Sequence, residues 1–171
     1  MMEFQSCFDI IGPIMVGPSS SHTAGVVSIG KFIHELVGGC PEEATIIFYD
    51  SFSETHQGHG TDKALLGGLL GMDTDDSRIK HSIQLTAQYG MAYEFQLEDS
   101  CPYFEHPNTT VVTVKRGECA AKVGGASLGG GLSKIFMIDE EMVDIRLSAG
   151  DDFAALANRY QPRRKLIAGA V

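Results

Sequence analysis

The sequence predicts an α+β domain, because helix-like stretches dominate the first half of the chain and strand-like stretches the second half. Helical patterns occur at residues 23–37, 61–71 and 78–89, whereas four of the six strand-like stretches lie beyond residue 105. Regular alternation of strands and helices would instead favour a doubly wound sheet. A length of 171 residues is enough for one domain with its own core.

Composition and charge exclude several classes of function. The chain is 43% hydrophobic with a mean hydropathy of +0.00, which is typical of a globular protein. A net charge of −9 opposes binding to nucleic acid. No apolar run approaches the roughly 18–20 residues of a membrane helix, and no signal-like block follows the N-terminus. We therefore expect a cytoplasmic protein that binds neither nucleic acid nor membrane.

The first half of the chain is predicted to contain three helices and one strand. Apolar residues recur at helical spacing over 23–37, and two glycines follow, as is common after a helix. Residues 44–51 are rich in β-branched and aromatic side chains and predict a buried strand. Residues 61–71 and 78–89 predict two further helices.

The second half is predicted to be a meander of strands. The expected strands are 92–97, 109–115, 119–123, 134–138 and 143–147. Gly117 predicts a hairpin between the second and third of them. The glycine-rich segment 124–131 is interpreted as a flexible connection or a close-approach turn rather than an anion-binding nest. A short helix is expected at 152–160, and 164–171 has the pattern of the start of another strand.

Four cysteines, Cys7, Cys40, Cys101 and Cys119, are scattered along the chain. None forms a C-x-x-C pair, so the usual local signatures of zinc and iron–sulfur sites are absent. We expect reduced cysteines, some of them packing residues, and no metal site on this chain.

The segment 17–23 has the sequence Gly-Pro-Ser-Ser-Ser-His-Thr and precedes the first predicted helix. Small hydroxyl residues at a helix start, together with free backbone N–H groups, can hold a carboxylate or phosphate. His22 adds a group that exchanges a proton near neutral pH. The alternative is that this segment only caps the helix.

A second polar segment, residues 51–62, lies between a predicted strand and a predicted helix. His56 and His59 have a spacing that two metal ligands can adopt, but no third and fourth ligand is evident nearby. Proton transfer by one histidine, or binding of a carboxylate, is the preferred interpretation. The alternative is an ordinary loop in which Thr61 or Asp62 caps the helix.

Taken together, residues 8–13, 17–25 and 58–62 resemble the β chain of bacterial two-subunit iron–sulfur L-serine dehydratases. The resemblance covers roughly residues 1–150, and the serine–histidine loop is its most specific part. It implies conversion of L-serine to pyruvate and ammonia without pyridoxal phosphate. It also implies a [4Fe-4S] cluster on a separate α chain, acting as a Lewis acid on the serine hydroxyl.

The resemblance also implies roles for residues of both loops. His22 and His59 are the candidates for proton transfer or orientation, and Asp62 for orienting a histidine or contacting the ammonium group. Which histidine does what stays open, as does serine against a related β-hydroxy amino acid. The candidates for holding the substrate are hydroxyl residues, namely Ser19, Ser20, Ser21, Thr23 and Thr61.

The resemblance implies a fold similar to the allosteric substrate-binding domain of phosphoglycerate dehydrogenase. Residues 1–150 would form this domain, and 151–171 a C-terminal extension or the start of a truncated ACT domain. The expected partners are the α chain and L-serine, in a homo- or hetero-oligomer. The alternatives are a non-catalytic module that senses L-serine or another small carboxylate, and a purely structural protein.

Overall fold

A six-stranded sheet organises the computed structural model, which describes residues 13–160. The strands are β1 (Glu43–Tyr49), β2 (Ala92–Glu98), β3 (Asn108–Arg116), β4 (Cys119–Gly129), β5 (Leu132–Ile138) and β6 (Glu141–Leu147). The helices are α2 (Gly25–Leu36), α3 (Asp50–Thr55), α4 (Thr61–Leu69), α5 (Ser82–Tyr89) and α6 (Phe153–Asn158). A turn of π-helix, η1 (Ser20–Ala24), precedes α2, and a 3₁₀ turn, η2 (Ser77–His81), precedes α5.

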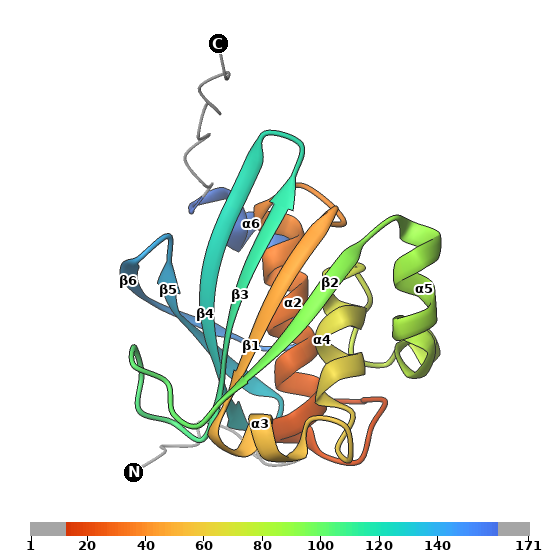
Figure 1. The fold of residues 1–171 in the computed structure, drawn as a ribbon, viewed down its shortest axis with the longest axis vertical. Coiled ribbons are helices and arrows are strands. Elements are labelled where there is room, and N and C mark those ends of the chain that lie inside the picture. The colour runs from red at the N-terminus through yellow and green to blue at the C-terminus, as the bar shows by residue number, and fades with distance from the viewer. Residues whose placement is uncertain (1–12, 161–171) are drawn as a thin grey trace.

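The sheet has the strand order β2-β1-β3-β4-β5-β6. β1 and β2 are parallel, whereas β3 to β6 form an antiparallel meander. Helices α2, α4 and α6 lie on one face of the sheet (Figure 1). This segregation confirms the predicted α+β class. The predicted hairpin is confirmed too, with Arg116 opposite Cys119 around Gly117.

The glycine-rich segment was predicted wrongly as a connection. β4 continues through it to Gly129, and the turn comes only afterwards. The reason is packing, because a Cβ on Gly124 would lie 2.4 Å from the Phe136 ring and one on Gly125 would lie 2.9 Å from Ile29. These glycines let the strand pass close to large neighbours.

Two other boundaries differ from the predicted ones. The strand predicted over 44–51 ends at Tyr49, and the next six residues form α3. Asp50 makes this change of direction with a left-handed φ of 47°. The helix predicted over 78–89 is divided into η2 and α5. The strand predicted over 164–171 lies outside the described residues.

Helices α2 and α4 cross at unusually short range. A Cβ on Gly68 would lie 2.3 Å from the Val27 carbonyl oxygen, and one on Gly30 would lie 2.6 Å from the Leu65 carbonyl oxygen. Backbone therefore meets backbone at the crossing, and the fully buried Ile33 and Leu65 belong to the core around it. The crossing fixes the start of α2 relative to the start of α4, where the two polar loops lie.

The end of the described chain belongs to the same core. α6 packs against α2, with Phe153 and Ala157 buried. Within residues 13–160, no helix is long and apolar enough to cross a bilayer.

Candidate functional site

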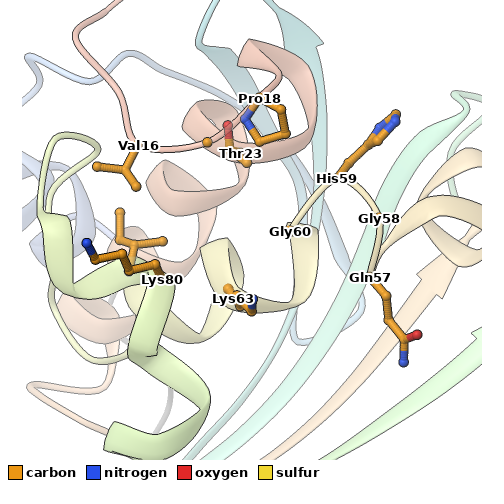
Figure 2. Close-up of a pocket in the computed structure, with 11 residues that line it drawn as sticks. Val16, Pro18, Thr23, Gln57, Gly58, His59, Gly60, Lys63 and Lys80 are labelled. Atoms are coloured by element: carbon orange, nitrogen blue, oxygen red, sulfur yellow. The ribbon is translucent and has the colours of Figure 1, made fainter.

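The two polar loops predicted from the sequence border one pocket of about 240 Å³. It lies between the segment before α2 and the turn before α4, with η2 forming a further wall (Figure 2). This volume is below the roughly 300–1,000 Å³ of pockets for drug-sized ligands, so the pocket suits a small metabolite. Its lining residues are Val16, Gly17, Pro18, Thr23, Gln57, Gly58, His59, Gly60, Lys63, Ile79 and Lys80.

The first wall folds back on itself through local hydrogen bonds. The Thr23 N–H donates to the Ser19 carbonyl oxygen over 2.9 Å, and the Thr23 hydroxyl donates to the same oxygen. The His22 N–H donates to Ser19 Oγ over 3.3 Å, which is the capping interaction expected at a helix start. Gly17 has a φ of +126°, and a Cβ there would lie 2.5 Å from Thr23 Cγ2. Only glycine fits this tight loop.

His22 is buried, and hydroxyl groups face both of its ring nitrogens. Nδ1 lies 3.0 Å from Ser21 Oγ and 3.3 Å from Ser19 Oγ, while Nε2 lies 3.3 Å from Ser51 Oγ. Burial, followed by the charge of His59, holds the pKa of His22 below its ordinary value of 6.5. The ring is therefore neutral at physiological pH.

His59 lies on the second wall in a different environment. Its side chain is exposed and makes no hydrogen bond to the described residues. The next residue, Gly60, has a φ of 72°, which turns the chain into α4. The His59 ring meets the His22 ring edge to face, with centroids 4.5 Å apart and planes at 85°. The two candidate histidines are therefore in direct contact, and His59 is the one available to a ligand.

Several predicted site residues have other partners. Ser19 and Ser21 bond to His22, and Ser20 lies in η1 without lining the pocket. Asp62 accepts a hydrogen bond from the Lys63 N–H over 2.7 Å, and the described contacts do not join its carboxylate to either histidine. The Thr61 hydroxyl is fully buried and has no hydrogen-bond partner among the described residues. Thr23 and His59 are the predicted residues that line the pocket.

Lys63 and Lys80 were missed by sequence reasoning. They are the two lysines of the pocket lining, and no acidic residue lines it. Neither lysine forms an ion pair with a described residue. Lys63 lies in the first turn of α4, where the helix dipole disfavours a cation. A lysine in that position is the local signal by which the sequence could have drawn attention to Lys63.

His56, the other histidine of the second loop, belongs to the packing of the domain. Its Nδ1 lies 3.0 Å from the Ser53 carbonyl oxygen, and its ring stacks on Phe48 at 5.7 Å. Residues 13–160 contain no group of three or more histidine, cysteine or acidic side chains that could hold a metal ion. The cysteines in this part of the chain are Cys40, Cys101 and Cys119, all free thiols, while Cys7 lies outside it.

Comparison with known proteins shows which family has these two loops. A model of the serine dehydratase β chain matches residues 6–121. This chain belongs to the serine dehydratase β-chain family. The matched range includes both walls of the pocket and the Gly30–Gly68 crossing that brings them together.

Relatives in the family extend the likeness over most of the chain. A probable L-serine dehydratase β chain of Bacillus subtilis strain 168 is 47% identical over 86% of this chain and 65% of its own length. The L-serine dehydratase β chain of Peptoniphilus asaccharolyticus is 38% identical over 97% of this chain and 73% of its own. L-serine dehydratase 2 of Escherichia coli strain K12 is 33% identical over 80% of this chain, but over only 34% of its own length. The chain thus spans about two thirds of these β chains.

Proposed function

We propose that this chain is the β chain of an L-serine dehydratase and converts L-serine to pyruvate and ammonia together with a separate α chain. The observation that carries the proposal is the contact between the rings of His22 and His59, whose centroids lie 4.5 Å apart, with His59 lining one small pocket. Each histidine comes from one of the two loops on which the family resemblance rests. The printed names of the β-chain relatives support the same activity.

The reaction requires a group that accepts the α-proton of serine as the β-hydroxyl leaves. Loss of water gives 2-aminoacrylate, which becomes an imine that water hydrolyses to pyruvate and ammonia. His59 is the group on this chain suited to accept the proton, because it is an exposed imidazole that lines the pocket. His22 supports its ring from behind.

The substrate carboxylate needs a positive environment beside this base. Lys63 and Lys80 line the same pocket as His59, whose ring points away from them (Figure 2), and no acidic residue lines this pocket on a chain whose net charge is −9. The N–H groups at the start of α4 do not add to the positive charge of these lysines, because those of Thr61 and Asp62 donate to the His56 carbonyl oxygen and that of Lys63 donates to the Asp62 carboxylate. In this arrangement the lysines replace Ser19 and Ser21 as the carboxylate ligands, since those hydroxyls bond to His22.

The pocket of this chain is one part of the active site, and the α chain contributes the other. The cysteines in residues 13–160 do not gather into a ligand set, so the residues described here do not fit a [4Fe-4S] cluster. We assign the cluster to the α chain. The same proposal includes a cytoplasmic hetero-oligomer, a likeness of the fold to the allosteric substrate-binding domain of phosphoglycerate dehydrogenase, and a domain boundary near residue 150.

Reconstitution tests this function. The chain is purified alone, mixed with a cluster-loaded α chain under anaerobic conditions, and assayed for pyruvate from L-serine and from L-threonine as a comparison substrate. We expect no activity from either chain alone and rapid pyruvate formation by the mixture. An inactive mixture, combined with tight binding of L-serine by this chain alone in calorimetry, would instead identify a sensing module.

A further inference from the structure

The structure assigns a role to Ser51, which lies at the start of α3 on the far side of His22 from the serine loop. We propose that Ser51 is a positioning residue that fixes the ring and tautomer of His22, and through His22 the orientation of His59. The inference rests on the proposed function, because it explains how the base of that reaction is held. No part of the resemblance to the family assigns a role to Ser51.

The first step of the argument is the set of contacts around the His22 ring. Ser51 Oγ lies 3.3 Å from Nε2, and it is the one described hydrogen bond from β1 or α3 to this ring. The opposite nitrogen, Nδ1, has two hydroxyls, Ser21 Oγ at 3.0 Å and Ser19 Oγ at 3.3 Å. A neutral imidazole has one donor and one acceptor. A hydroxyl can donate or accept, so a defined tautomer needs a partner at both nitrogens, and Ser51 is the described partner of Nε2.

The second step is the backbone that holds Ser51 in place. Asp50 is a non-glycine residue with a φ of 47°, a conformation that persists only where the surroundings enforce it. The Ser51 N–H donates to the Pro107 carbonyl oxygen over 3.0 Å, and Asp50 pairs with Asn108. The Thr55 hydroxyl donates to the Ser51 carbonyl oxygen over 2.6 Å. Both backbone polar groups of Ser51 are thus satisfied elsewhere, which leaves its hydroxyl for His22.

The third step connects Ser51 to the reacting group. Phe52 packs edge-on against His22 with centroids 5.3 Å apart, and His59 contacts the ring at 4.5 Å. His22 is therefore a buried ring that does not line the pocket, and it contacts His59, which does. Any rotation of the His22 ring shifts the surface on which His59 rests. Loss of the Ser51 hydroxyl permits such rotation without removing a group that touches the substrate.

The decisive experiment compares three variants, Ser51→Ala, Ser51→Thr and Ser53→Ala. Ser53 lies on the same helix, and its hydroxyl makes no described hydrogen bond, so Ser53→Ala is the matched control. The first readout is the ring ¹⁵N spectrum of His22 in the chain alone, at pH 7.5. The second is kcat and KM for L-serine after mixing with the cluster-loaded α chain.

We expect wild type and Ser53→Ala to show a single neutral tautomer of His22, and Ser51→Ala to show averaged ring nitrogens. Ser51→Ala should lower kcat on the order of tenfold with KM nearly unchanged, within the roughly hundredfold that a misplaced reacting group can cost. Ser51→Thr should restore the tautomer and most of kcat.

An unchanged His22 spectrum in Ser51→Ala overturns the inference, and so does an equal loss of kcat in Ser53→Ala. The spectrum is recorded on the chain alone, so it judges Ser51 even if the wild-type mixture makes no pyruvate. A wild-type mixture that makes no pyruvate would count against the proposed function and not against the contact between Ser51 and His22.

Discussion

The two walls of the pocket differ in how their polar groups are used. In the wall before α2, the Ser19 and Ser21 hydroxyls bond to His22, and Thr23 bonds back to Ser19. In the turn before α4, His59 is exposed and has no side-chain hydrogen bond to the described residues. In the proposed function, the serine-rich segment before α2 therefore supports His22, and the turn before α4 presents His59 as the reactive group. Density of polar residues in a sequence does not by itself locate the atom that reacts.

Replacing His59 should have the largest effect on catalysis, because it removes the proposed base from the turn before α4. His59→Gln should lower kcat for L-serine by about 10²–10⁴-fold, the usual contribution of a general acid or base. His56→Gln is the matched control, since His56 stacks on Phe48 and does not line the pocket. Steady-state kinetics of the reconstituted mixture measure both variants. A decrease in kcat of less than threefold in His59→Gln would contradict the assignment of the base to the turn before α4.

The crossing of α2 and α4, which positions the two walls of the pocket, can be disrupted without changing a residue that lines the pocket. Gly68→Ala places a Cβ 2.3 Å from the Val27 carbonyl oxygen, so α2 and α4 must move apart. Overpacking of this kind typically costs 1–3 kcal/mol, and we expect a decrease of about 2 kcal/mol in the free energy of unfolding. Urea denaturation of the chain alone measures it.

Gly67→Ala on the same helix is the control for this crossing. Its Cβ would lie 3.1 Å from Ile79 Cγ1, a side-chain atom rather than backbone, and alanine favours the helix by roughly 1 kcal/mol. We expect a free energy of unfolding close to that of wild type. Equal losses in Gly67→Ala and Gly68→Ala would show that the crossing is not the close contact described here.

Much of the fold follows from local patterns, and the exceptions have physical causes. The strands β1 to β6 and the helices α2, α4 and α6 were predictable because their apolar periodicity matches their burial. The extension of β4 through Gly124 and Gly125 was not predictable, because glycine usually ends a helix or strand. The Phe136 and Ile29 side chains, which leave no space for a Cβ at these two positions, explain why glycine lies within the strand. The α3 turn depends on Asp50 in a left-handed conformation, which sequence propensity disfavours.

The sequence predicted which loops form the site, but not which of their side chains line the pocket and which contact one another. The sequence indicated that His22 and His59 belong to polar loops before helices, and the structure brings the two rings together. Whether Ser19 and Ser21 face a ligand or a neighbouring ring depends on the π-turn at η1, which no local pattern predicts. Lys80 reaches the pocket from η2, a contact that only the tertiary fold creates.

Removing a cation from the pocket should have a moderate effect that falls on binding. Lys63→Met keeps the length of the side chain and removes its charge, so a substrate carboxylate loses one attractive partner. We expect KM for L-serine to rise about tenfold, which corresponds to about 1.4 kcal/mol, with kcat within twofold of wild type. Lys115→Met is the control, because Lys115 lies in β3 and pairs with Glu43 over 3.9 Å. An unchanged KM in Lys63→Met would mean that the carboxylate lies elsewhere.

Acidification should have the smallest effect, which falls on the free energy of unfolding and tests the environment of His22 in the wall before α2. Burial lowers the pKa of both His22 and His106 in the folded chain, His22 also through the charge of His59. Below the ordinary value of 6.5, the unfolded chain therefore binds protons that the folded chain does not, and stability falls as pH falls. Each histidine contributes at most about 1.4 kcal/mol per pH unit.

Urea midpoints at pH 7.5 and 5.5 separate the two histidines. His106→Asn should remove one part of the acid-induced loss and leave the part due to His22. His22→Asn should remove the other part, while lowering stability at pH 7.5 because the hydroxyls of Ser21 and Ser51 lose a ring nitrogen. A midpoint of His22→Asn that falls as steeply with acid as that of wild type would show that His22 is protonated as readily in the folded chain as in the unfolded one. The serine loop would then accommodate a charged His22 ring below pH 6.5, which contradicts a wall that holds this ring neutral by burial.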